Sequence, residues 1–268
     1  MNPFFFGSRD RALFGTLHPP RTRSAGREGA VLCGPFGVEY MRSHRAFRQL
    51  TTLLTRGGYH VLRFDYGGTG DSAGEGEAQT LEQWTDDVST AIEELQDTAG
   101  LDQVTLVGLR LGAALALEAV ARGGAGGSGV DRLVLWDPVA DGERWLEEVL
   151  PAGVEATARE LSAPRGSGVV GVSGFPLPLA LFQELRTLLP DGAGIPPGTP
   201  VELVVSRADP MYDGLERRLA GSGLDVRHHL IPSEGNWAEG DAFGSALLPQ
   251  GIIQGIVDLL VGSGEEVR

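Results

Sequence analysis

Short apolar segments alternate with amphipathic segments along most of this chain, and that alternation restricts its fold more than any other feature. Apolar runs typical of strands lie at residues 30–33, 59–64, 104–107, 133–136, 201–205 and 226–231. Apolar residues at helical spacing lie between or after them, at residues 44–55, 81–95, 109–121, 211–219 and 247–260. This pattern predicts a mostly parallel sheet with helices on both faces. Residues 4–6 and 12–17 predict a hairpin at one edge of that sheet.

The alternation is interrupted between residues 139 and 198. Two helical stretches, at residues 143–150 and 179–189, are separated there by turns rich in Pro and Gly. We interpret residues 139–198 as a helical lid inserted between two strands. The predicted organisation is a core made of residues 1–138 and 199–268, with the lid between them.

The charge balance excludes several classes of partner. The 268 residues include 22 Lys and Arg against 36 Asp and Glu, which gives a formal net charge of −14. Binding to duplex nucleic acid or to an anionic membrane surface requires clustered positive charge, so we expect neither partner. Every basic residue is Arg, and the absence of Lys excludes Schiff-base chemistry and a Walker-type phosphate lysine.

Cysteine content and hydropathy indicate the compartment. Cys33 is the single cysteine, which excludes an internal disulfide and a multi-cysteine metal site. No stretch reaches the ~20 apolar residues of a membrane helix, and no signal peptide is recognisable. We therefore expect a soluble cytoplasmic protein that holds no metal and no cofactor.

The most informative motif lies at residues 104–113. An apolar strand runs into Gly108-Leu109-Arg110-Leu111-Gly112, and a helix that is apolar nearly all round follows. A strand, a Gly-x-X-x-Gly turn and a helix form the layout of a nucleophile elbow. The two glycines are required because strand and helix approach each other closely around the central residue. The central residue here is Arg110.

At these residues the chain resembles the α/β-hydrolase superfamily over nearly its whole length. The segment Asp65 to Ser72 is similar to the Asp-x-x-Gly-x-Gly-x-Ser segment of that superfamily, and Leu32 to Gly37 stands at its oxyanion loop. Segments Glu39 to Arg45, Arg63 to Tyr66 and Leu135 to Val139 resemble the serine-aminopeptidase-like branch that includes exosortase-associated hydrolases. The resemblance implies an α/β-hydrolase fold with a lid over the active site.

The superfamily pattern also implies a triad in the order nucleophile, acid, histidine. Asp209 fits the acid, but the nucleophile position is Arg110, and a guanidinium cannot form a covalent intermediate. The base would lie at residues 232–247, where no histidine occurs and Asn236 follows the glycine at the expected place. Superfamily members that lost triad residues include the peptide epimerase of bottromycin biosynthesis, and this chain is similar to that class.

The predicted site therefore combines three charged residues with a pocket wall. Asp209, Asp137 and Arg110 are the candidate catalytic residues, since each lies at the carboxyl end of a predicted strand. The candidate ligand-binding residues lie in or near the oxyanion loop, at the start of the helix at residues 44–55, on the elbow helix, in the lid or in the last loop: Cys33, Phe36, Val38, His44, Leu111, Trp145, Phe182, Asn236 and Trp237.

Two interpretations of Arg110 follow from the sequence. It forms an ion pair with Asp209 or Asp137 and fills the space of the lost triad, or it binds an anion at the start of the helix, where the helix dipole favours negative charge. In the empty protein we expect one of these two aspartates to be its partner, with a ligand carboxylate competing for the same place.

Three functions remain open from the sequence. The first is a non-hydrolytic enzyme that transfers a proton, as an epimerase or isomerase does, on a peptide or acyl-type biosynthetic intermediate. The second is a hydrolase with relocated machinery, using Cys33 or a water activated by Asp209. The third is a non-catalytic pseudo-hydrolase that holds a ligand or partner. In each case we expect a small-molecule or peptide ligand that carries a carboxylate.

Overall fold

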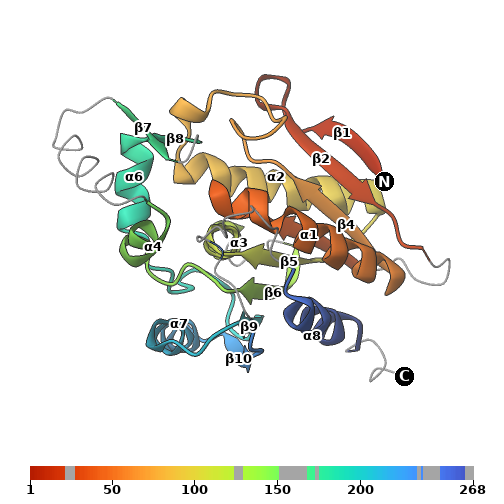
Figure 1. Ribbon diagram of the computed structural model, residues 1–268. Coiled ribbons are helices and arrows are strands. Elements are labelled where there is room, and N and C mark those ends of the chain that lie inside the picture. The colour runs from red at the N-terminus through yellow and green to blue at the C-terminus, as the bar shows by residue number, and fades with distance from the viewer. Residues whose placement is uncertain are drawn as a thin grey trace.

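A computed structural model of the protein describes residues 1–21, 28–123, 129–150, 168–172, 175–233, 237 and 248–262. Its centre is an eight-stranded sheet in the order β1-β2-β4-β3-β5-β6-β9-β10 (Figure 1). The strands are β1 Asn2–Phe6, β2 Leu13–His18, β3 Glu28–Cys33, β4 Tyr59–Phe64, β5 Val104–Leu109, β6 Val130–Trp136, β9 Pro200–Val205 and β10 Asp225–Leu230. From β4 to β10 every pairing in the sheet is parallel. The predicted mostly parallel sheet is confirmed.

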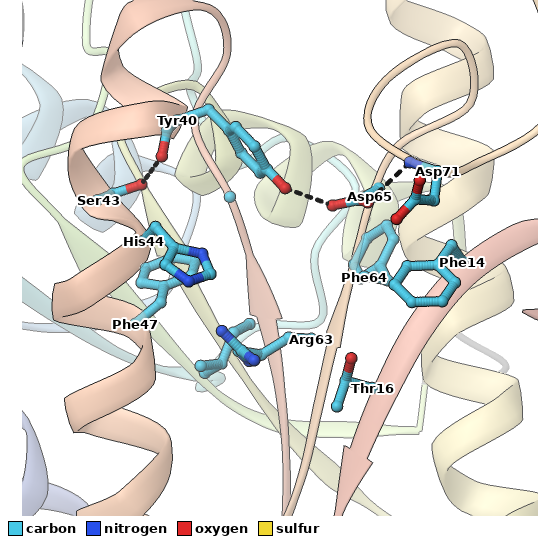
Figure 2. Close-up of a pocket in the computed structure, with 12 residues that line it drawn as sticks. Phe14, Thr16, Tyr40, Ser43, His44, Phe47, Arg63, Phe64, Asp65 and Asp71 are labelled. Carbon is cyan, nitrogen blue, oxygen red and sulfur yellow. Dashed lines mark hydrogen bonds between the residues drawn. The ribbon is translucent and has the colours of Figure 1, made fainter. Parts of the chain in front are cut away.

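The antiparallel edge is the hairpin of β1 and β2, which joins the sheet through β2 and β4. In this pairing Thr16 lies opposite Arg63. Because side chains alternate along a strand, both residues point to the same face of the sheet. A pocket lies over this edge of the sheet (Figure 2).

Helices cover both faces of the sheet (Figure 1). Helices α1 Val38–Arg56 and α8 Gln250–Val261 pack on one face, and α2 Leu81–Ala99, α3 Leu111–Gly123 and α7 Pro210–Gly221 on the other. Strand β3 shows the division directly, because Leu32 belongs to the core on the α1 side and Val31 to the core on the α3 side. Both cores are apolar, so successive residues of the central strands are all buried.

Helix α1 starts earlier than the sequence indicates. Apolar spacing predicts the helix from residue 44, whereas it begins at Val38. Gly37, just before it, has φ of 66°, a left-handed conformation that glycine adopts without strain. The polar residues 42–45 interrupt the apolar spacing and hide this start, which places Glu39 in the first turn of the helix.

The insertion between β6 and β9 combines helices with a hairpin. Helices α4 Gly142–Val149 and α6 Leu179–Arg186 are present as predicted, and α4 packs against α6. Strands β7 Val169–Val172 and β8 Phe175–Pro178 form a small antiparallel sheet of their own. The prediction of a purely helical lid was therefore incomplete, because two prolines in β8 disguise a short strand. The domain boundaries at residues 139 and 198 stay a prediction.

Short 3-10 helices η1 Arg9–Arg11 and η2 Gly76–Ala78 complete the elements. Over the described ranges, no helix combines the length and the apolar character that crossing a bilayer requires.

Candidate functional site

The candidate site is centred on the sharp turn between β5 and α3. Arg110, the one residue between the two elements, has φ of 54°. The turn is fixed by its neighbours: a Cβ atom at Gly108 would collide with the backbone of Ala113, and one at Gly112 with the carbonyl oxygen of Cys33. The structure therefore has the strained strand–turn–helix that the Gly-x-X-x-Gly spacing predicts, with arginine at its tip.

The side chain of Arg110 is enclosed by acceptors. Its Nε donates to Glu39 Oε1 at 2.7 Å, its Nη2 to Glu148 Oε2 at 2.8 Å and its Nη1 to the Asp137 carbonyl oxygen at 3.3 Å. The exposed fraction of the Arg110 side chain is 4%, and that of Glu39 is 1%. A buried cation is tolerated because two carboxylates neutralise it.

Glu39 is the innermost member of this ion-pair cluster. Its second oxygen accepts a hydrogen bond from Trp145 Nε1 at 3.1 Å, so both carboxylate oxygens have donors. Its position in the first turn of α1 adds the favourable end of the helix dipole. Burial alone would lower the pKa of Arg110, but the adjacent carboxylates of Glu39 and Glu148 raise it above its usual value. Arg110 is therefore a permanent cation.

Glu148 is the exposed member of the cluster. It lies on α4, its side chain is 22% exposed, and its Oε1 also accepts from Arg207 Nη2 at 3.3 Å. The ion pairs with Arg110 and Arg207 connect α4 to the elbow and to the segment after β9. Of the two carboxylates on Arg110, Glu148 is the one with side-chain surface exposed to water.

The expected partners of Arg110 were wrong. Asp137 offers Arg110 only its backbone carbonyl, because its carboxylate accepts from the Ser206 backbone N–H at 2.7 Å and from Trp237 Nε1 at 2.9 Å. Asp137 is buried and has φ of 41°, so it is held in a left-handed conformation at the end of β6. Its carboxylate orients neighbouring backbone and Trp237 rather than the guanidinium.

Asp209 is occupied in a similar way. Its Oδ1 caps α7 by accepting from the Met211 backbone N–H at 3.0 Å. Arg144, on α4, donates to both of its oxygens, at 3.1 and 2.7 Å. The acid that fits the triad position thus pairs with an arginine of the lid region and not with Arg110.

Two cavities lie between the oxyanion-type loop and the insertion. The larger, of about 140 Å³, is lined mainly by aromatic and glycine residues, among them Phe36, Tyr66, Trp84 and Phe175. The smaller, of about 20 Å³, is lined by Glu39 and by the apolar face of α4. A volume of that size holds about one water molecule, so a ligand reaches Arg110 only if α4 and Glu148 move.

The predicted ligand-binding residues divide into three groups. Phe36, Val38 and Trp145 line the cavities below the insertion. Leu111, Phe182 and Cys33 are buried in the core, and Trp237 is buried beside Trp136 with a ring-centroid distance of 5.5 Å. His44 lines a different pocket, on the α1 side of the sheet, and Asn236 lies outside the described residues.

Cys33 is poorly placed for a nucleophile. Its side chain is fully buried at the end of β3, and burial raises the pKa of its thiol. A thiolate is the reactive form, so this environment opposes reactivity.

Glu39 and Glu148 are the carboxylates of the candidate site that sequence reasoning missed. Glu39 was within a segment that resembles relatives, but the helix start at Val38 that directs it to the elbow is not visible in the apolar pattern. Glu148 follows Arg144 at i,i+4 on a predicted helix, which indicates a surface ion pair rather than a partner for Arg110. A buried cation requires acidic neighbours, and that requirement was the one available signal.

One group of side chains could hold a cation away from the elbow. Ligand atoms of Asp213, Glu216 and His228 lie within 4.8 Å of one another, on α7 and β10. His228 Nδ1 lies 2.8 Å from Glu216 Oε2, and this contact accounts for their proximity.

Comparison with known proteins agrees with this geometry. The family model of serine aminopeptidase, S33, matches residues 40–165, a little under half of the chain, and this match includes the elbow. Solved structures, among them an alpha/beta hydrolase domain-containing protein, superpose on essentially the whole chain. The chain has the α/β-hydrolase fold.

Solved structures similar to the chain include a hydrolase-domain protein, an epimerase and a lipase. The mouse alpha/beta hydrolase domain-containing protein 10 is 18% identical, with a TM-score of 0.64 and 100% of both chains covered. The bottromycin epimerase BotH, in complex with bottromycin A2, is 21% identical, with a TM-score of 0.58 and 98% and 99% covered. A monoglyceride lipase from Saccharomyces cerevisiae is 12% identical, with a TM-score of 0.68 and 99% and 94% covered.

No protein of curated function matches the sequence. The solved structures show the α/β-hydrolase fold, whereas the reaction depends on the residues of the site.

Proposed function

We propose that this protein is a non-hydrolytic α/β-hydrolase-fold enzyme that transfers a proton on a bound anionic ligand, in the manner of an epimerase or isomerase. The observation that carries the proposal is the position of Arg110. It replaces the nucleophile at the tip of the elbow, and it is held by one buried carboxylate, Glu39, and one accessible carboxylate, Glu148.

An anionic ligand exchanges with Glu148 at the guanidinium. Arg110 offers its Nη2 to Glu148, whereas Nε stays with the buried Glu39. A ligand carboxylate that takes the place of Glu148 keeps Arg110 neutralised, so the exchange leaves no unpaired buried charge. The apolar body of the ligand fits the aromatic cavity beside Phe36 and Trp84.

The displaced Glu148 then acts as the base. It accepts a proton from the carbon adjacent to a ligand carbonyl, and the electron pair left on that carbon is delocalised onto the carbonyl oxygen. Return of a proton from water to the opposite face of the carbon, with loss of the proton from Glu148 to water, inverts the centre without net gain or loss of atoms. Glu148 replaces Asp209 and Asp137 in this role, since those carboxylates are occupied by Arg144, Ser206 and Trp237.

The experiment follows deuterium uptake. Purified protein is incubated in D2O with a panel of N-acetylated peptides, each supplied as the C-terminal amide and as the C-terminal free acid. Exchange at each stereocentre is measured by mass spectrometry and chiral chromatography. We expect exchange into a carboxylate-bearing substrate, loss of at least tenfold in Glu148→Gln, and unchanged exchange in Glu147→Gln, the exposed neighbour on α4. Labelling by a fluorophosphonate probe, or turnover of p-nitrophenyl esters, would contradict the proposal.

A second candidate is ligand binding without chemistry. It is favoured by the hydrogen bonds that the two carboxylates accept, two at Asp137 and three at Asp209, which leave neither acid free for proton transfer. In that case the panel includes peptides that bind, as measured by calorimetry, but none that exchanges deuterium. A relocated hydrolase has less support, because Cys33 is fully buried with a raised thiol pKa and Asp209 is paired with Arg144.

A further inference from the structure

The aromatic cavity beside the oxyanion-type loop has a volume of about 140 Å³, and segments far apart in the sequence supply its walls. Phe36 lies on the loop before α1, Trp84 on α2 and Phe175 on β8 of the insertion. The ring centroids of Phe36 and Trp84 are 5.2 Å apart, and those of Phe36 and Phe175 are 6.0 Å apart. The aromatic walls therefore hold one another in place without a ligand.

The polar side chains of these walls already have partners within the protein. Tyr66, Trp84 and Thr69 donate to backbone carbonyl oxygens at 3.1, 3.1 and 2.8 Å. The Tyr40 hydroxyl donates to Asp65 Oδ1 at 2.6 Å (Figure 2). Among the described residues, no charged side chain lines the cavity. A carboxylate would find neither a free side-chain donor nor a cation there, so the space suits an apolar group.

The volume of the aromatic cavity corresponds to one benzene-sized ring. An apolar protein cavity of about 150 Å³ binds benzene. A fused two-ring group exceeds this volume, and a flexible alkyl chain loses conformational freedom when it is held in one shape. A planar aromatic ring also makes edge-to-face contacts with the ring walls that an alkyl chain does not make. The cavity therefore favours a single aromatic ring.

The smaller cavity indicates where the rest of such a ligand lies. Phe36 and Gly37 line both cavities, so the two are neighbours. The smaller cavity reaches Glu39, whose carboxylate pairs with Arg110. Its opposite wall is α4, the helix that carries Glu148. Movement of α4, which exchange of a ligand with Glu148 requires, enlarges this cavity and extends the aromatic cavity toward Arg110.

We propose that the aromatic cavity is a subsite for one phenyl ring, and that the substrate is an acid with a phenyl side chain, its ring in this cavity and its carboxylate directed to Arg110. The position of the carboxylate rests on the function proposed for the elbow, whereas the ring subsite depends only on the walls and the volume of the cavity.

Neutral alcohols test the ring subsite without the charge of Arg110. Benzyl alcohol, cyclohexylmethanol, 1-hexanol and 2-naphthylmethanol are titrated, and NMR follows the indole N–H resonance of Trp84, assigned with Trp84→Phe. The resonance of Trp136, in the core on the other face of the sheet, is the internal control. We expect benzyl alcohol to bind at least threefold more tightly than cyclohexylmethanol or 1-hexanol. It should bind at least tenfold more tightly than 2-naphthylmethanol, whose second ring exceeds the volume.

Variants that change the volume locate the ring. Phe175→Ala enlarges the cavity from β8 and should reverse the order of the two aromatic alcohols, so that 2-naphthylmethanol binds more tightly than benzyl alcohol. Thr69→Phe fills the cavity and should weaken the binding of benzyl alcohol at least tenfold. The matched control is Phe5→Ala on β1, where the side chain is 62% exposed, and it should leave both affinities unchanged.

Charged ligands separate the ring subsite from the contact with Arg110. Phenylacetate, 3-phenylpropanoate and 4-phenylbutanoate place the carboxylate at increasing distances from the ring, and each is compared with its amide by calorimetry. We expect one of these acids to bind at least tenfold more tightly than its amide in the wild type and to lose this advantage in Arg110→Met. If every acid binds only as tightly as its amide while benzyl alcohol binds as expected, the carboxylate contact and the function proposed for the elbow fail, and the ring subsite stands.

Three results would overturn the ring subsite. They are an unchanged Trp84 resonance with benzyl alcohol at millimolar concentration, binding of 1-hexanol as tight as that of benzyl alcohol, and unchanged affinity for benzyl alcohol in folded Thr69→Phe. If Phe175→Ala does not fold, Thr69→Phe decides, since it adds volume to the wall and removes no aromatic contact.

Discussion

At the scale of single residues, the elbow is organised around two strained positions. Arg110 and Asp137 are the non-glycine residues with positive φ in the described ranges, at 54° and 41°. Such conformations cost about 1–3 kcal/mol each and persist where the surroundings fix them. Backbone hydrogen bonds fix both positions. The Arg110 N–H donates to the Trp136 carbonyl oxygen at 3.1 Å, and the Asp137 N–H donates to the Val204 carbonyl oxygen at 2.9 Å. The fold retains the strain of a nucleophile elbow although the tip residue is an arginine.

The Arg110–Glu39 pair gives a prediction for stability. Glu39→Gln removes the negative charge from a pair that is almost completely buried and leaves Arg110 under-neutralised, which should lower the free energy of unfolding by about 3 kcal/mol. Glu147→Gln, on the exposed side of α4, should change it by less than about 0.5 kcal/mol. Urea unfolding followed by circular dichroism measures both.

A second variant tests the cause. Combining Glu39→Gln with Arg110→Met removes the buried cation too, so it should recover a large part of the lost stability. Equal stability of Glu39→Gln and the wild type, or no recovery in the double variant, would show that the pair does not hold the elbow.

At the scale of elements, the position of α4 decides what the site can do. Its Arg144 and Glu148 make the contacts to Asp209 and Arg110, and its Trp145 makes the contact to Glu39. The helix is short, with eight residues from Gly142 to Val149, and Asp141 caps it by accepting from the Arg144 N–H at 3.1 Å. Movement of this one helix would break the ion pairs of Glu148 and Arg144 and leave the Arg110–Glu39 pair in place.

Two glycine-to-alanine variants test the packing of α4 on α6. Gly142 begins α4, and a Cβ atom there would collide with the Leu185 carbonyl oxygen of α6. Gly142→Ala should therefore displace α4 and destabilise the protein by about 1–3 kcal/mol. Gly214 lies in α7, where a Cβ atom would meet only the flexible Arg218 side chain at 3.5 Å, so Gly214→Ala should stabilise by about 0.5–1 kcal/mol through helix propensity.

Thermal unfolding of both variants is the measurement. Opposite signs for the same chemical change would show that close packing at residue 142, and not alanine itself, is responsible. A Gly142→Ala variant that melts at or above the wild-type temperature would contradict the tight α4–α6 contact.

At the scale of the whole molecule, stability should depend on pH through two histidines. Burial, with contributions from Arg63 and Arg21, lowers the pKa of His18 from 6.5 to about 4. Burial also lowers the pKa of His60. Between about pH 6.5 and pH 4 the unfolded chain therefore binds more protons at these sites than the folded protein, so their contribution to stability is complete above pH 6.5 and is lost on acidification.

The comparison uses His18→Gln/His60→Gln. Its free energy of unfolding should fall less steeply than that of the wild type between pH 7 and pH 4.5, in denaturant titrations at each pH. Parallel profiles for the two proteins would refute the assignment. The other titrating groups are common to both proteins, so the difference isolates the two histidines.

The sequence by itself determined the order and kind of the core elements, the elbow and the arginine at its tip. These depend on local properties: hydrophobic periodicity marks each core strand and helix, and the glycine spacing around Arg110 follows from backbone sterics over five residues. The resemblance to the α/β-hydrolases rests on the same short segments, and the structure confirms the fold.

Only the tertiary structure decided which charges meet. Asp209 and Asp137 lie at strand ends as expected, yet the carboxylates on Arg110 come from Glu39 and Glu148, which are 71 and 38 residues away along the chain. These ion pairs depend on where α1 begins and on how α4 packs against the core. Neither feature can be recognised from hydrophobic periodicity in the sequence.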